Sequence, residues 1–207
     1  MAGPTWNSTS TSCEPDVDLG LIAGTGWAAG LNVYAVALIL GLVGRFGGAP
    51  MPEQLTSTPV LIGAGVLYAV EFFADKVPYL DNIWDAIHTV IRPVAAGAIG
   101  YWLAGEVGMS EAIGAGTSGV LALVSHSTKA TTRAAVNVSP EPVSNISLSI
   151  FEDGLVGGVV ALALAAPIVA LVVVIIFLIL GVWLMVKLWR GIARLWARLA
   201  ERTAAPG

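Results

Sequence analysis

Residues 146–189 form a long apolar run that dominates the second half of the chain. As a single helix rising about 1.5 Å per residue, this run would be roughly 65 Å long, which is about twice the thickness of a bilayer's hydrocarbon core. The run must therefore break or extend beyond a membrane. Asp153-Gly154 and Pro167 are the two candidate break points, and the sequence does not choose between them.

The composition is typical of an integral membrane protein. Hydrophobic residues make up 56% of the 207 residues and charged residues only 12%, whereas a soluble domain has about 25% charged residues. The mean hydropathy is +0.81. The length fits one compact membrane domain, and the small net charge of −4 indicates no nucleic-acid partner. The one cysteine, Cys13, follows no signal peptide, so we expect a free thiol.

The two ends of the chain differ in charge, and this difference predicts the orientation. Residues 1–18 form a polar, acidic tail without Lys or Arg. The basic residues gather after the last span and into the tail at 190–207: Lys187, Arg190, Arg194, Arg198 and Arg202. Because positive charge beside a span stays in the cytoplasm, we expect the C-terminus inside and the N-terminus outside. Interleaved tryptophans favour a basic helix that lies along the anionic inner surface.

Residues 19–189 are predicted to form one transmembrane domain. Its first span, residues 19–44, is interrupted by "AGTGWAAG", which indicates a half-helix, a break and a second helix from about Ala29 to Arg45. Residues 59–73 form the next span. A second apolar stretch with a glycine interruption begins near residue 110 and leads into polar and basic residues. Glycines of this kind mark either broken helices or close helix contacts.

An internal repeat is one explanation of this pattern. With an offset of 64 positions, Pro78 meets Pro142. The same offset aligns three further pairs: Asp81 with Asn145, Asp85 with Ser149, and His88 with Glu152. We therefore predict an all-α polytopic membrane fold with two pseudo-symmetric, inverted repeats that contain Gly-broken or re-entrant helices. The repeats would span about residues 19–104 and 110–167, with a final span at about 168–189.

Four ionisable residues share one face of a predicted helix. Asp81, Asp85, His88 and Arg92 follow one another at intervals of four, three and four residues, so they fall within an arc of about 60°. The opposite face is apolar. We expect the four side chains to point into one polar cavity, with Arg92 paired to Asp85 or to Glu152.

Further polar residues are predicted to complete this site. They are Asn145, Ser149 and Glu152 on the facing helix, Lys129 and Arg133 on another, and the pair Glu71 and Asp75. A charge at mid-bilayer costs about 2.5–3.5 kcal/mol on insertion scales, so such residues normally mark an ion or substrate path. Solvation in the headgroup zone, or an Asp–Arg network that only locks helices together, would also explain them.

Other chemistries have weaker support. Asp81, Asp85 and His88 could supply metal ligands, but the nearby Arg92 disfavours a bound cation. "GAGTSG" lacks the strand of a dinucleotide fold and the lysine of a P-loop. No Ser–His–Asp or paired-carboxylate arrangement is specific enough to indicate an enzyme. We therefore expect no metal, no cofactor and no enzymatic activity.

Three segments resemble the bacterial membrane-protein family called domain of unknown function 4126. They are "GLNVYAVALILGLVGR", "EFFADKVPYLDNIWDAIHTVIRP" and "HSTKATTRAAVNVSPEPVSNISLSIFED", which cover most of residues 30–155. The resemblance implies a small multi-pass protein of the bacterial inner membrane and brings no settled activity.

The expected function is secondary transport or ion permeation. His88 would be the proton-coupling group, because the unperturbed pKa of histidine is near 6.5. The alternatives are a flippase or scramblase for a lipid or polyprenyl phosphate, since helix N-termini and basic groups suit phosphate, and a scaffold that transports nothing. Membrane lipids and a small ion or anionic solute are the expected partners, and the sequence is compatible with a homo-oligomer.

Overall fold

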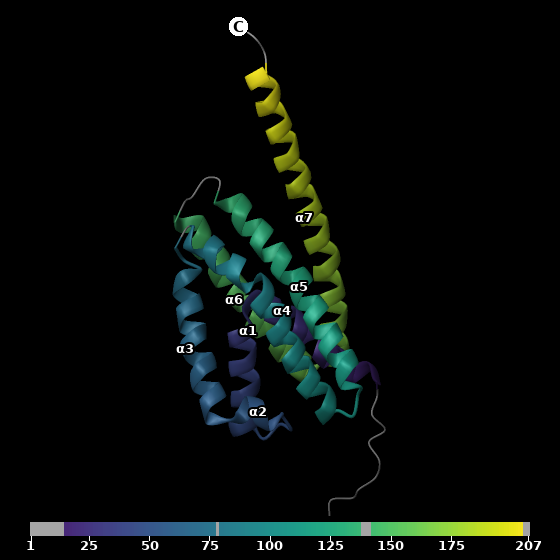
Figure 1. Ribbon diagram of the computed structural model, residues 1–207. Coiled ribbons are helices and arrows are strands. Elements are labelled where there is room, and N and C mark those ends of the chain that lie inside the picture. The colour runs from purple at the N-terminus through teal and green to yellow at the C-terminus, as the bar shows by residue number, and fades with distance from the viewer. Residues whose placement is uncertain (1–14, 78, 138–141, 205–207) are drawn as a thin grey trace, which may run out of the picture.

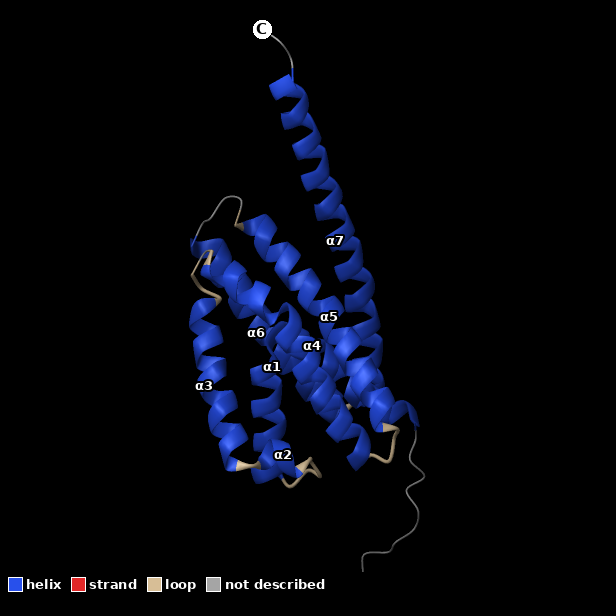
Figure 2. Cartoon of the chain, in the orientation of Figure 1, coloured by secondary structure: helices blue, strands red, loops and turns tan. Residues whose placement is uncertain are grey.

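The computed structural model describes residues 15–77, 79–137 and 142–204. Cys13, the rest of residues 1–14 and Pro78 lie outside the described residues. Within these ranges every regular element is a helix (Figure 2). The helices are α1 (Pro15–Gly47), α2 (Glu53–Thr56), α3 (Thr58–Ala74), α4 (Leu80–Glu106), α5 (Glu111–Val136), α6 (Pro142–Ala165) and α7 (Pro167–Ala204).

Helix α1 is broken at Asn32, where the backbone is extended (φ −156°, ψ 97°). The Asn32 Oδ1 atom accepts a hydrogen bond from the Ala35 amide at 2.9 Å, and so caps the second half of α1. The predicted break is therefore confirmed, but it lies at Asn32 rather than in the glycine-rich "AGTGWAAG".

The two halves of α1 form a hairpin whose ends lie at the same end of the bundle. Gly20 packs against Pro167 at the α6–α7 turn, and Gly41 packs against Leu55 in α2. Both of these contacts lie at the lower end of the molecule in Figure 1. Helix α1 thus enters the bundle, turns at Asn32 and returns, so it is broken as the sequence predicted. Its re-entry from one side of a membrane stays a prediction.

The remaining long helices alternate in direction around α1. In Figure 1, α3, α5 and α7 rise from the lower end, whereas α4 and α6 descend from the upper end. Because α4 and α6 run in the same direction, these segments do not show the inverted repeat that we expected. Helix α5 also runs unbroken from Glu111 to Val136, so the second half of the chain lacks the predicted broken helix.

The glycines of α1 and α5 serve close packing. A Cβ atom at Gly30 would lie 1.9 Å from Ser125 Oγ and 2.3 Å from the Ala122 carbonyl oxygen. Between α4 and α5, a Cβ atom at Gly100 would lie 2.4 Å from the Gly114 carbonyl oxygen. Small residues spaced four apart allow such approaches in membrane bundles. The alternative of close helix contacts is therefore correct for Gly114 and Gly119 of α5, whereas Gly116 meets nothing within 4 Å.

The long apolar run breaks at Pro167. Helix α6 passes through Asp153 and Gly154 without interruption and ends at Ala165, and α7 begins at Pro167. Helix α7 is 38 residues long and projects beyond the bundle at its C-terminal end (Figure 1). The basic C-terminal segment is thus a continuation of the final span. Its position along the inner membrane surface stays a prediction.

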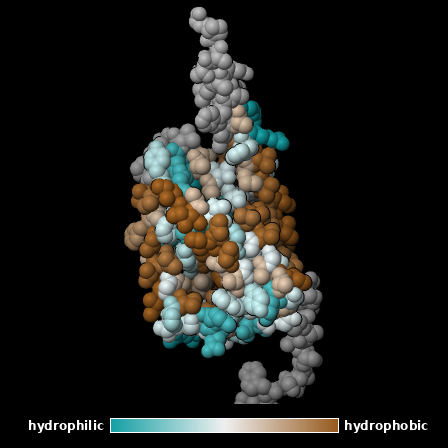
Figure 3. Space-filling view, viewed as in Figure 1, coloured by the Kyte–Doolittle hydropathy of each residue, from teal (hydrophilic) through white to brown (hydrophobic). Residues whose placement is uncertain are grey.

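The surface is apolar where a bilayer would contact it. Among the described residues, three helices are long and apolar enough, by length and composition, to cross a membrane: Leu19–Gly47, which lies in the broken helix α1, Val143–Ala165 and Pro167–Gly191. On the face shown in Figure 3, apolar side chains cover much of the middle, and hydrophilic ones gather at the lower end and at the upper left and upper right edges. Helix α4 likewise turns apolar residues outward, since Ile83, Ile87 and Val90 are exposed while its ionisable residues are buried.

Candidate functional site

The ionisable stripe of α4 points into the bundle. Asp81, Asp85, His88 and Arg92 are all buried, with at most 2% of each residue exposed. They meet polar residues from α3, α5 and α6, so the face predicted from their spacing is confirmed. Arg92 contacts Asp85 directly, whereas His88 meets Tyr34 of α1 and Asp81 meets Asn137 of α5. The shared polar cavity stays a prediction.

Arg92 lies at the centre of this group. Its Nη2 atom donates to Glu71 Oε1 at 2.9 Å, and its Nη1 atom donates to Asp85 Oδ1 at 3.2 Å. The predicted pairing with Asp85 is confirmed. The alternative partner, Glu152, pairs with other cations, and Glu71 from the end of α3 takes its place.

His126 is held as a neutral imidazole beside Arg92. The distance from Arg92 Nη1 to His126 Nδ1 is 2.6 Å. Because a guanidinium has no acceptor atom, Nδ1 must accept this hydrogen bond. The proton of the ring therefore resides on Nε2, which donates to the Asp85 carbonyl oxygen at 3.1 Å.

Two further cations of α5 link α3, α4 and α6. Lys129 Nζ lies 2.6 Å from Asp75 Oδ2. Arg133 donates to both carboxylate oxygens of Glu152, from Nε and Nη2. The Nη1 atom of Arg133 also lies 3.5 Å from Asp81 Oδ2 and donates to Asn145 Oδ1 at 3.0 Å. The two positions that the repeat alignment paired, Asp81 and Asn145, thus share one arginine.

The same cations reach the break in α1. The last carbonyl groups of a helix have no partner within the helix and carry partial negative charge. Arg92 Nη1 donates to the Gly30 carbonyl oxygen at 3.3 Å, and Lys129 Nζ donates to that of Leu31 at 3.1 Å. The end of the first half of α1 is therefore bound by the two cations that also hold Glu71, Asp75 and Asp85.

His88 occupies a different setting from His126. Its Nδ1 atom lies 2.8 Å from the Trp84 carbonyl oxygen, to which it donates. Its Nε2 atom lies 2.9 Å from the Tyr34 hydroxyl group. Neutral His88 accepts from that hydroxyl, and protonated His88 donates to it. His88 can therefore gain a proton without losing either partner.

The buried charges do not balance. In the part of the chain that the structure describes, the buried carboxylates are Glu71, Asp75, Asp81, Asp85 and Glu152, and the buried cations are Arg92, Lys129 and Arg133. With both histidines neutral and all five carboxylates ionised, five carboxylates against three cations leave two negative charges in excess. The partly exposed pair Lys76 and Asp153, 4.0 Å apart at the edge, adds no net charge. We call these eight buried residues the charge cluster.

Comparison with known protein families assigns this chain to one of them. The model of the family described as "Domain of unknown function (DUF4126)" matches residues 19–187. The chain belongs to this family. No curated protein and no solved structure matches the chain. The DUF4126 match takes in the charge cluster, the broken helix α1 and most of the final span.

The structure brings all the predicted site residues of this DUF4126 chain together. Ser149 lies at the edge of the group, where it accepts a hydrogen bond from Lys76 Nζ at 3.2 Å. In the described part of the chain, no group of three or more His, Cys, Asp or Glu residues could hold a metal ion.

Three members of the site were missed at the sequence level. His126 lies three residues before Lys129, and Asn137, which donates to both Asp81 carboxylate oxygens, lies four residues after Arg133. Extending the stripe of α5 in both directions would have found them. The contact of Tyr34 with His88 could not be predicted from the sequence, because it depends on the break in α1.

Proposed function

We propose that this chain is a small secondary transporter or ion-permeation protein that moves protons or another small cation through the charge cluster. The observation that carries this proposal is the excess of two buried carboxylates beside the break in α1. Each uncompensated charge in a bilayer costs about 2.5–3.5 kcal/mol or more. Two protons, or bound cations, would remove this cost.

The contacts favour a cation over an anion. Each buried cation of the cluster already lies within 3.2 Å of a carboxylate oxygen. A lipid phosphate or another anion would have to displace these carboxylates into an apolar surrounding. The flippase hypothesis for an anionic headgroup is thus less well supported. A scaffold held together by ion pairs has no need of two carboxylates more than its cations, so the excess favours transport over a scaffold.

The cluster is closed towards the lower end of the bundle. Beyond the break, the two halves of α1 pack on apolar residues of α4 and on small residues of α5, including the contact of Gly26 with Ser118. Polar residues instead continue upward from the break to Asp81 and Asn137. Transporters of several folds bind ions where a broken helix ends near the midplane.

The proposed membrane arrangement has five crossing helices, α3 to α7, around the re-entrant α1. The apolar helix α3 has 17 residues, and α4 and α5 hide their polar stripes inside the bundle. The basic end of α7 favours a cytoplasmic C-terminus, so the upper end in Figure 1 would face the cytoplasm. The inner membrane of a bacterium is the proposed location.

Sealed proteoliposomes separate the three functions. The purified chain would be reconstituted, and proton movement would be followed with an enclosed pH dye under an imposed membrane potential, with protein-free vesicles as the control. Flux above that control supports transport. Translocation of a labelled lipid headgroup without proton flux would favour a flippase, and neither signal would favour a scaffold.

A further inference from the structure

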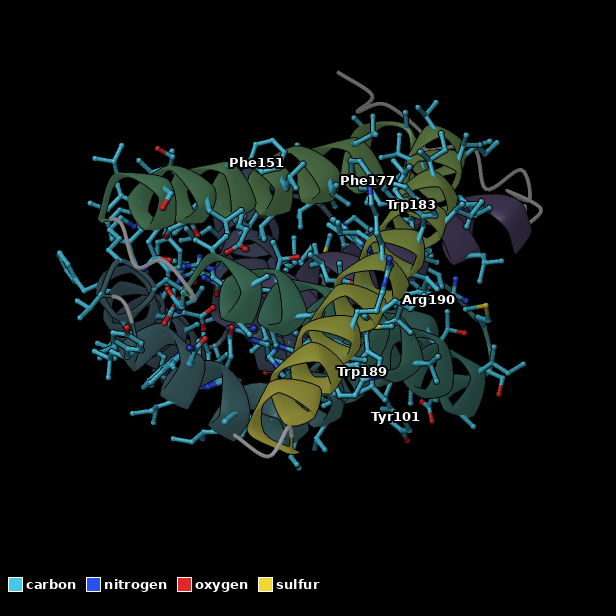
Figure 4. The ribbon with its side chains drawn as sticks, turned by 90° about the horizontal axis from the view of Figure 1, so that it is seen from above. Tyr101, Phe151, Phe177, Trp183, Trp189 and Arg190 are labelled. Atoms are coloured by element: carbon cyan, nitrogen blue, oxygen red, sulfur yellow. The ribbon has the colours of Figure 1, made fainter. Side chains whose placement is uncertain are left out.

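A pocket of about 280 Å³ opens beside the charge cluster. Its walls come from α6 and α7, its back from α5, and its inner end from Trp27 and Leu31 of α1. Helices α6 and α7 diverge from their common turn, as the view from above shows (Figure 4). Both helices carry exposed apolar residues, among them Phe151 and Leu180. The pocket therefore opens towards the side of the bundle that a bilayer would cover.

The pocket joins apolar walls to a charged end. Its walls include Leu148, Leu155, Phe177 and Leu184, whereas Lys129 and Glu152 line its inner part. Glu152 is the most exposed of the five carboxylates in the cluster, at 7%. A ligand that fills this pocket would thus place an apolar body between helices and one end against Glu152.

The charged residues at the inner end of the pocket determine which sign of charge a ligand should carry. Lys129 Nζ is the nearest cation, but three carboxylates lie within 4 Å of it: Asp75 at 2.6 Å, Glu152 at 3.7 Å and Glu71 at 3.8 Å. Arg133 is likewise bound to Glu152 and lies 3.5 Å from Asp75. The positive charges are therefore more than compensated, and the cluster as a whole is short of two cations.

We propose that the pocket between α5, α6 and α7 binds a hydrophobic organic cation that enters from the bilayer and places its positive end at Glu152. This inference deepens the proposed function, since it names a substrate class for the same cluster. A cation that neutralises the excess carboxylates competes with protons for them. Its binding should therefore weaken as the pH falls, as exchange of protons for the cation requires.

Two probes of equal shape and opposite charge test the proposal. Equilibrium dialysis of the purified full chain in detergent micelles, against empty micelles, would measure saturable binding of tetraphenylphosphonium and of tetraphenylborate. We expect saturable binding of the cation, one per chain, and none of the anion. Saturable binding of both ions alike, or of neither, would overturn the proposal.

Variants then place the site. Leu148→Trp fills the pocket and should weaken binding of tetraphenylphosphonium by about tenfold or more. Ile150→Trp adds the same side chain to the exposed face of α6 outside the pocket and should leave binding unchanged. Equal binding by the two variants would contradict the assignment. Glu152→Gln should weaken binding of the cation as well, and its thermal unfolding would confirm that it is folded.

The outcome is independent of the transport assay. If wild-type vesicles conduct protons but the chain binds no tetraphenylphosphonium, the pocket inference fails and the proposed function stands. If the chain binds the cation at this pocket but no proton flux is found, the pocket inference stands and the proposed function fails.

Discussion

Lys129 donates from Nζ to the carbonyl oxygen of Leu31 at 3.1 Å, at the residue where the first half of α1 ends. The same ammonium group lies 2.6 Å from Asp75 Oδ2. One side chain of α5 thus stabilises a broken helix and an acidic residue at the end of α3. This contact joins the break in the backbone to the charge cluster.

Replacing Lys129 should destabilise the fold severely. Lys129→Met removes the donor to the Leu31 carbonyl group and the nearest cation to Asp75, which keeps only Arg133 at 3.5 Å. Breaking a buried pair in this way costs about 3–5 kcal/mol. Lys76→Met is the matched control, because Lys76 is only partly buried and its loss should cost far less. Thermal unfolding in micelles measures both, and equal Tm values would show that Lys129 does not hold the break.

Close packing at Gly30 gives a second prediction. Gly30→Ala places a methyl group against Ser125 and the Ala122 carbonyl oxygen, and overpacking typically costs about 1–3 kcal/mol. Gly116→Ala in α5 meets nothing within 4 Å and should leave stability unchanged or raise it, because alanine favours helix. A Gly30→Ala chain as stable as the Gly116→Ala chain would contradict the packing of α1 on α5.

His88 should set the pH response of transport. The His88→Ala variant should conduct with a flatter pH dependence than the wild type between about pH 5 and 8, where histidine changes charge. Tyr34→Phe removes the hydroxyl group that lies 2.9 Å from Nε2 and should shift the same profile. Proton flux measured across this pH range checks both variants, and unchanged profiles in both would remove His88 from the path.

The stripe of α4 could be predicted from sequence because side-chain spacing alone determines which residues share a helix face. Arg92 and Asp85 were paired correctly for this reason. The contact with Glu71 could not be predicted, since it depends on how α3 packs beside α4. The inverted repeat was inferred from matched residue types, which say nothing about the direction of a helix. The break in α1 lies at Asn32 but was predicted in the glycine-rich segment before it. Glycine occurs both where helices break and where they pack closely, so its presence alone does not locate a break.

The orientation of the chain is tested at Cys13. With an acidic N-terminal tail and a basic end to α7, we expect the N-terminus outside. A membrane-impermeant thiol reagent should then label Cys13 in intact cells. Labelling that appears only after lysis would reverse the orientation and place the upper end of the bundle in Figure 1 outside.

Proton flux in the Asp85→Asn chain tests the central claim most directly. Asparagine keeps the shape and the oxygen that accepts from Arg92 Nη1 but removes one of the excess negative charges. We predict that Asp85→Asn proteoliposomes lose flux while the protein stays folded. The control Asp153→Asn, which changes a partly exposed residue at the edge, should conduct like the wild type. Wild-type flux in Asp85→Asn, with a normal pH response, would contradict the account and leave the cluster a structural network.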